Sequence, residues 1–287
     1  MKNTSQIGKC HICGTIAKLS YEHIPPQKAF NGRNVKMFNG ADFRKVVESK
    51  YSYWEYPKLD LKYSQKQSGA GWYTLCESCN NNTGSWYGDS LVRFIYEGYI
   101  NIKLLGGERN LHHMNKYNFI FKQIYPLRII KEAFAMFCSI NPPEFADKFP
   151  DIKNFILNRD SNELDITKYA VYLYIIQGTI ARYVGDAKMG QRQKDGSMII
   201  KELSECNAPP YGMLLEIDPK PFAFPTVNII DFAKYNYDDK VDLQIEIPVY
   251  ECNSMLPADF RTKEEIEETG KINRANNTPG IIAFKKN

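Results

Sequence analysis

Long hydrophobic runs are missing from this chain of 287 residues. No segment approaches the length of about 18 apolar residues that a transmembrane helix requires, so we expect no membrane span. The longest apolar run, residues 169–176, is rich in tyrosine and β-branched residues and predicts a buried strand. The first residues also lack a basic segment followed by an apolar one. We therefore expect no secretory signal peptide and a cytoplasmic protein with reduced cysteines.

Internal repeats, low-complexity blocks and phosphate-binding loops are also absent from the sequence. Apolar residues make up 43% and charged residues 24% of the chain, a composition typical of a globular protein. The length predicts one large domain or two modest ones. We expect one domain over residues 1–100 and a second over residues 101–287. The second shows no recognisable catalytic cluster, which favours a regulatory, sensing or oligomerisation role.

The sequence does contain seven cysteines, four of them in two Cys-x-x-Cys pairs. Cys10 pairs with Cys13 and Cys76 with Cys79, and 62 residues separate the pairs. Each pair can present two thiolates at the geometry that tetrahedral Zn²⁺ requires, so the four residues predict a structural zinc site. Disulfides are not expected in a reducing compartment, and a thioredoxin-like redox motif needs only one pair near a βαβ pattern. The long interval means that further structure is built inside the zinc-closed loop.

Positive charge is concentrated on the segment that holds the cysteine pairs. Residues 1–87 carry 12 lysines and arginines against 6 aspartates and glutamates, whereas the whole chain has a net charge of +4. A basic surface around a metal site favours a polyanionic partner, and a nucleic-acid backbone is the commonest one. Lysine-rich surfaces are also ordinary solvated faces, so the charge supports this interpretation without deciding it.

The pattern along the chain predicts an α+β fold in which helices precede a mostly antiparallel sheet. A helix is expected after Asn80, with Thr83 or Ser85 as its N-cap, and another over residues 126–139. Another short helix is expected over residues 144–158, with Phe149-Pro150 breaking it from inside. The expected strands are residues 169–177, 180–184, 198–203, 213–217, 226–232 and 243–250. The tail over residues 262–287 looks partly disordered or loosely docked.

Glu22, His23 and Asn80 place a carboxylate, an imidazole and a side-chain amide next to the predicted zinc site. Hydrolysis of a phosphodiester needs a deprotonated water and a cation that neutralises charge on the phosphate and the leaving oxygen. His23 can accept the proton because imidazole titrates near neutral pH. Glu22 and the amide oxygen of Asn80 can bind a hard cation such as Mg²⁺. Neighbouring strand residues face opposite sides, so Glu22 and His23 act together only if the chain bends, which the two following prolines favour.

Taken together, Cys-x-x-Cys, Glu-His-Ile-Pro-Pro and Leu-Cys-x-x-Cys-Asn resemble the zinc-bearing HNH endonucleases, the ββα-metal or His-Me finger group, over residues 9–88. The resemblance implies an N-terminal ββα-metal module in which His23 is the general base. It also implies that Glu22 and Asn80 bind the catalytic divalent metal. The structural zinc would then be held by Cys10, Cys13, Cys76 and Cys79.

Two positions depart from the pattern of that family. The middle asparagine of the family, which orients the histidine through a backbone contact, corresponds to Gly71 in this sequence. Asn39 or a member of the asparagine run at 80–82 could take over this role. The segment between His23 and the third cysteine is longer than in minimal members of the family, which predicts an insertion.

The resemblance implies a metal-dependent endonuclease, a hydrolase that cuts DNA with Mg²⁺ or a similar divalent ion. HNH modules fused to sensor domains occur in bacterial anti-phage defence, and this architecture is similar. We therefore expect control by a regulatory ligand or by homo-oligomerisation through the C-terminal domain. The alternative from another class is a non-catalytic zinc-binding module that docks nucleic acid or a protein partner.

Several other reactive or aromatic residues have ordinary structural explanations. His11 is expected to face solvent within its knuckle, and His112-His113 to lie in a polar loop. Cys138 follows an apolar run and is expected to be a small buried hydrophobe. The aromatic residues between positions 51 and 73 could stack on bases, although sheet packing explains them nearly as well.

Overall fold

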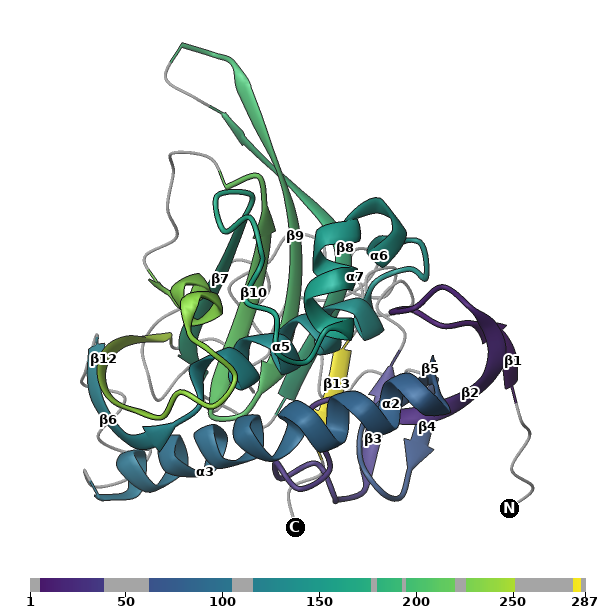
Figure 1. The fold of residues 1–287 in the computed structure, drawn as a ribbon, viewed down its shortest axis with the longest axis horizontal. Coiled ribbons are helices and arrows are strands. Elements are labelled where there is room, and N and C mark those ends of the chain that lie inside the picture. The colour runs from purple at the N-terminus through teal and green to yellow at the C-terminus, as the bar shows by residue number, and fades with distance from the viewer. Residues whose placement is uncertain are drawn as a thin grey trace.

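The computed structural model of the protein describes residues 6–38, 62–104, 116–176, 180–192, 195–219, 226–250 and 281–284. Within these ranges the chain has the expected α+β architecture. A small N-terminal sheet leads into a long helix, and a large, mostly antiparallel sheet is covered by further helices (Figure 1). No helix in the described ranges is both long and apolar enough to cross a lipid bilayer.

Three antiparallel strands near the N-terminus form the small sheet, in the order β1-β2-β5. Their bounds are Gln6–Lys9 for β1, Ile16–His23 for β2 and Gly71–Cys76 for β5. The turn after β1 is tight because the amide of Gly14 donates to the carbonyl of Cys10 over 2.9 Å. Gly14 has a φ of 80°, a conformation that favours glycine. β2 and β5 pair so that His23 lies opposite Gly71, and β5 continues directly into a helix. The result is a β-β-α unit.

One continuous helix follows β5 and covers residues 77–104. It consists of α2 (Glu77–Thr83), a π-helical turn η2 (Gly84–Gly88) and α3 (Asp89–Leu104). Its buried apolar side chains include Leu91, Phe94 and Ile95, which lie on one face of α3. The predicted N-cap is wrong, because the helix already begins at Glu77. Thr83 lies inside it, and its hydroxyl donates to the carbonyl of Cys79 over 3.0 Å.

The large sheet has ten strands, and segments from both ends of the described sequence contribute to it. Nine strands follow the order β4-β3-β13-β8-β9-β10-β7-β12-β6, and β11 pairs with β7 beside this path. The pairings are antiparallel except that of β12 with β7, which is parallel. The bounds are β3 (Val35–Phe38), β4 (Tyr63–Lys66), β6 (Lys116–Ile124), β7 (Tyr169–Ile176), β8 (Ile180–Arg192), β9 (Met198–Ala208), β10 (Tyr211–Ile217), β11 (Val227–Asn228), β12 (Val241–Tyr250) and β13 (Ile281–Phe284).

A central helix, α5 (Pro126–Ile140), lies between the long helix and the large sheet (Figure 1). It confirms the helix predicted over residues 126–139. Nearly all of its side chains are buried, and one hydrophobic core extends from the small sheet through α5 to the large sheet. The short helix expected over residues 144–158 is present as two helices, α6 (Phe145–Lys148) and α7 (Pro150–Leu157), which are separated at Phe149 as the predicted break implies. The domain boundary at residue 100 stays a prediction, and α3 passes through that position.

Some segments differ from the predicted elements. The strand expected over residues 226–232 is wrong for most of its length, because the short β11 is followed by a 3₁₀ turn, η3 (Ile230–Lys234). β6 was not predicted, although its buried and exposed residues alternate as strand residues do. In the C-terminal tail, β13 pairs with β3 and β8 and is therefore part of the large sheet. His112, His113 and Asn39 lie outside the described residues.

Candidate functional site

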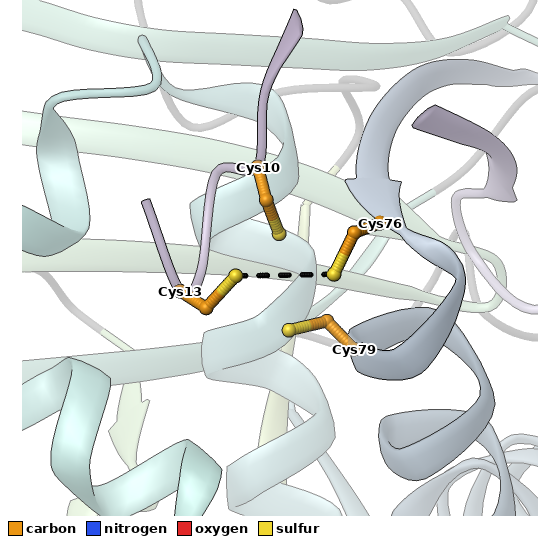
Figure 2. Close-up of side chains that lie close together, drawn as sticks. All are labelled: Cys10, Cys13, Cys76 and Cys79. Carbon is orange, nitrogen blue, oxygen red and sulfur yellow. Dashed lines mark hydrogen bonds between the residues drawn. The ribbon is translucent and has the colours of Figure 1, made fainter. Parts of the chain in front are cut away.

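The four cysteines of the two knuckles come together in space, as their spacing predicts. Their four Sγ atoms all lie within 4.8 Å of one another, and the sulfurs of Cys13 and Cys76 are 3.8 Å apart (Figure 2). Sulfurs at the corners of a tetrahedral zinc site with bonds of about 2.3 Å are about 3.8 Å apart. The first pair comes from the turn between β1 and β2, and the second from the junction of β5 with α2. The cluster is therefore compatible with a structural zinc ion.

The chemical state of these sulfurs also suits a metal. None of the four forms a disulfide. The Cys79 thiol and nearby backbone amides donate hydrogen bonds toward Cys10 and lower the pKa of that thiol to about 4. Burial raises the pKa of Cys76. A lowered pKa favours the thiolate of Cys10, the form of cysteine that binds zinc. The Cys138 side chain is fully buried, as expected of a small hydrophobe.

His11 is not the solvent-facing residue that the sequence predicts. Its side chain is partly buried, and its Nδ1 lies 3.2 Å from the carbonyl oxygen of Cys138 on α5. Burial lowers the pKa of His11. The backbone amide of His11 also donates to the carbonyl of Thr74 over 2.9 Å, which ties the first knuckle to β5. His11 therefore connects the cysteine cluster to the central helix.

The predicted trio lies where β2 meets the long helix. Glu22 and His23 are the last two residues of β2, and Asn80 lies in α2 just after the second knuckle. The side-chain amide of Asn80 donates to the hydroxyl of Ser20 over 2.9 Å and to the carbonyl of Tyr21 over 3.4 Å. The fold thus brings residue 80 against the strand that carries the other two, although 57 positions separate it from His23.

The two neighbouring strand residues face opposite sides of the hairpin. The ring of His23 packs edge-on against that of Tyr21, with centroids 5.1 Å apart, so these two residues share one face. Ser20 and Glu22 alternate with them along β2, and Ser20 faces Asn80. Glu22 and Asn80 therefore lie on the helix side of the hairpin, and His23 lies on the other side. The structure therefore does not bring the three side chains together on one face of the hairpin.

The hydrogen bonding of His23 defines which ring nitrogen is free. Its Nε2 lies 3.1 Å from the carbonyl oxygen of Ser68. A carbonyl can only accept, so Nε2 carries the proton and Nδ1 keeps its lone pair. Burial lowers the pKa of His23, which keeps the ring neutral at neutral pH. These properties are those of a general base.

Glu22 has a different environment from His23. Burial raises the pKa of its carboxyl group to about 8. Among the described residues, neither a hydrogen-bond donor nor a cationic side chain is paired with this carboxylate. A partly buried carboxylate without such partners favours either a proton or a metal cation as its counter-charge.

Sequence reasoning missed the residues that hold this segment in place. Gly71 cannot carry the asparagine that the family resemblance would put there, because a Cβ atom would lie 2.0 Å from the carbonyl oxygen of Glu22. The backbone contact to His23 comes instead from Ser68, three positions earlier. Every residue type has a main-chain carbonyl, so the amino-acid sequence could not indicate this contact.

The buried Asn31 side chain joins two segments of this region through hydrogen bonds; below, this set of bonds is called the Asn31 clamp. Its Nδ2 donates to the carbonyls of Pro25 and Ala70 over 2.7 and 2.8 Å, and its Oδ1 accepts from the amide of Ala70 over 2.7 Å. These three bonds join the chain just after His23 to the chain just before β5. Asn31 was not among the proposed substitutes for the middle asparagine, and no spacing rule pointed to it.

An open cleft of about 660 Å³ adjoins the hairpin, next to Tyr21 and Tyr73. Its lining includes Tyr21, Lys66 and Tyr73 from the hairpin region and Tyr183 from β8. The rings of Tyr21 and Tyr73 pack edge to face at 5.3 Å, and the Lys66 ammonium lies 5.6 Å from the centroid of Tyr21. Aromatic faces beside a lysine are the groups that single-stranded nucleic acids contact.

Comparisons with known proteins add no family assignment, since no protein-family model, no curated protein and no solved structure matches this chain. The four-cysteine cluster is the part of the predicted site whose geometry the structure shows directly.

Proposed function

We propose that the protein is a metal-dependent endonuclease of the HNH type that hydrolyses phosphodiester bonds of DNA. The observation that carries the proposal is the placement of His23. Its Nε2 is bound to a backbone carbonyl, so a neutral Nδ1 remains at the end of a β-β-α unit built around a four-cysteine cluster. Such a fixed, neutral imidazole is suited to take a proton from water.

The opposite orientation of Glu22 and His23 is compatible with this chemistry. A bound divalent metal such as Mg²⁺ would polarise the phosphate and stabilise the leaving oxygen. Glu22 and Asn80 would hold the metal through their side-chain oxygens, provided that the amide of Asn80 turns its oxygen toward it. His23 acts on the water from the other side. A phosphodiester placed across the end of β2 can touch both sides, so the side chains need not converge on one atom.

The proposal also includes a structural zinc ion and DNA as the substrate. We assign the structural Zn²⁺ to Cys10, Cys13, Cys76 and Cys79, because tetrahedral zinc matches their sulfur separations. The excess of positive charge on residues 1–87 supports a polyanionic substrate. The region after residue 100 would control the nuclease, through a ligand or through association of two copies.

The test is cleavage of plasmid DNA by the full-length protein with Mg²⁺ or Mn²⁺. Replacing His23 with alanine should lower the cleavage rate by ~10²–10⁴-fold, the usual contribution of a general base. A matched control is Gln27→Ala, since the exposed Gln27 side chain contacts the same carbonyl of Ser68, at 3.4 Å, without offering a base. Undiminished cleavage by the His23 variant would refute the proposal. DNA binding without cleavage, unaffected by chelation and by loss of His23, would favour the non-catalytic docking module.

A further inference from the structure

Three aromatic side chains that the proposed chemistry has not used come together on the surface. Phe30 lies in the loop after β2, and Tyr96 and Tyr99 lie on α3. The residues are 37%, 43% and 36% exposed, in that order. The ring of Phe30 packs against the other two, with its centroid 4.5 Å from that of Tyr96 and 5.2 Å from that of Tyr99. These three residues, called the aromatic cluster below, present part of their ring surface to solvent.

The backbone conformation of Phe30 is unfavourable for an aromatic residue. Its φ is 61°, in the left-handed region that glycine adopts easily and a bulky residue rarely does. Hydrogen bonds hold the chain in this turn. The amide of Ala29 donates to the carbonyl of Pro26 over 2.8 Å, and the next turn is closed by a bond of 3.1 Å from the amide of Asn31 to the carbonyl of Gln27. A residue kept in an unfavourable conformation points to a role for its side chain, which here is a partly exposed ring.

The loop that carries Phe30 links the aromatic cluster to the end of β2. The Asn31 clamp holds the residue after Phe30 against the chain just before β5. Phe30 follows His23 by seven residues, so their Cα atoms are at most about 25 Å apart. Stacked bases of one DNA strand are about 3.4 Å apart, so about seven nucleotides span this distance. One short strand can therefore reach both the aromatic cluster and His23.

Positive charge lies next to the aromatic cluster. The loop over residues 24–34 contains two basic residues, Lys28 and Arg33, and no acidic residue. Lys103 follows Tyr99 by about one helical turn, and its ammonium lies 4.8 Å from the centroid of that ring. The acidic residues of α3 are each paired with a cationic side chain, Asp89 with Lys28 over 3.1 Å and Glu97 with Arg93 over 2.7 Å. Arg33 and Lys103 are both exposed, and these carboxylates do not neutralise them.

The composition of this surface favours a nucleic acid over a protein as its partner. The exposed stripe of α3 continues with Ile100 and Leu104, which a protein partner would also cover. Lysine is depleted in the core of protein interfaces, however, and Lys103 lies within this stripe. Rings beside cations are typical of proteins that bind single-stranded nucleic acids, because every base has a face that stacks on a ring. Phosphates supply the negative charge that complements Arg33 and Lys103.

We propose that the aromatic cluster binds unpaired bases of single-stranded DNA, while Arg33 and Lys103 bind its phosphates. Stacking on rings does not discriminate between bases, so the cluster binds a strand without sequence preference. It holds a strand that passes the end of β2, and cleavage then occurs next to an unpaired segment. This inference rests on the proposed function for its substrate, but DNA binding can be measured without cleavage.

The experiment measures binding of a fluorescein-labelled oligothymidine of about 12 nucleotides to the full-length, zinc-loaded protein, by fluorescence anisotropy without added divalent metal. The test variants are Tyr99→Ala and Phe30→Gly, each of which removes one ring. Glycine suits the φ of 61° at position 30, so the second variant should keep the fold. We expect each variant to bind at least ~10-fold more weakly, the contribution of one stacked base. An oligonucleotide with abasic sites in place of the thymidines should bind the wild type similarly weakly.

Two control variants should keep the wild-type affinity. Tyr99→Phe retains the ring that stacks. Ile200→Ala removes an exposed apolar side chain from β9, which does not belong to this surface. Circular dichroism and thermal unfolding check the fold of each variant, and Phe30→Gly decides if Tyr99→Ala does not fold.

Wild-type affinity in both test variants, no DNA binding by the wild type, or equal binding of the abasic oligonucleotide would overturn the inference. Test variants that keep their DNA affinity but lose self-association in analytical ultracentrifugation would assign the cluster to a protein interface instead. A wild type that binds DNA through the cluster but cuts none with Mg²⁺ would refute the nuclease and leave the cluster in place. DNA cleavage by a protein whose test variants bind DNA normally would refute only the cluster.

Discussion

Replacing Asn31 with alanine tests how the segment around His23 is held. The side chain is 1% exposed and makes three hydrogen bonds of 2.7 to 2.8 Å, two to Ala70 and one to Pro25. A buried hydrogen bond contributes about 1 kcal/mol net, and more when its partner is left unpaired, so the loss should be about 3 kcal/mol. The unfolding temperature should fall by roughly 5–10 °C for a chain of this size.

The assay is urea unfolding followed by tryptophan fluorescence, with the slope of the transition checked so that only stability has changed. Asn31→Asp should be at least as damaging, because a carboxylate would face the carbonyls of Pro25 and Ala70, to which the native amide donates. Asn162→Ala provides the control, since that exposed side chain makes a single bond of 3.5 Å. A loss below about 1 kcal/mol for Asn31→Ala would refute the clamp, because even one of its bonds should contribute that much.

Other perturbations follow from the same structure. Gly71→Ala should destabilise the protein and displace the end of β2, because the new Cβ would lie 2.0 Å from the carbonyl oxygen of Glu22; a variant with wild-type circular dichroism and unfolding temperature would contradict this. Cys76→Ser should lower the zinc content measured by elemental analysis below the one ion per chain expected of the wild type, whereas Cys206→Ser, which changes a buried cysteine of the large sheet, should leave it intact. If His23 is the base, the cleavage rate at saturating Mn²⁺ should be flat near neutral pH and fall as the pH drops through the pKa of His23, which burial holds below 6.5. The imidazole must be neutral to accept a proton, so a rate that rises toward acidic pH would exclude this role.

The parts of the fold that depend on local sequence were predictable. Each knuckle positions its own two cysteines, so their spacing was enough to predict the cluster. Apolar residues at helical spacing, among them Leu127, Ile130 and Phe134, made the helix over residues 126–139 predictable, and all three are buried in α5. Local periodicity could not show that α5 is buried on all sides, because that depends on the long helix and the sheet packed around it.

The features that could not be predicted from the sequence depend on contacts between segments that are distant along the chain. β3 and β4 join the large sheet through β13, which comes from the other end of the described chain. Strand pairing of this kind has no local signature. Ser68 contacts His23 through its main chain, and Asn31 is one of many asparagines until its buried position is known. Glu132 of α5 resembles any glutamate of a helix until its burial in the core is known.

The long helix connects the end of β2 with β6 as well as forming part of the core. A helix of residues 77–104 spans about 40 Å, and it is stiff along its axis. At one end it carries Asn80. Near the other, Arg93 donates to the carbonyl of Lys122 on β6 over 2.7 Å, and Glu97 accepts from the amide of the same residue over 3.1 Å. A torque applied at β6 would therefore turn Asn80 relative to β2, so a change far from the cysteines could alter the geometry at the end of that strand.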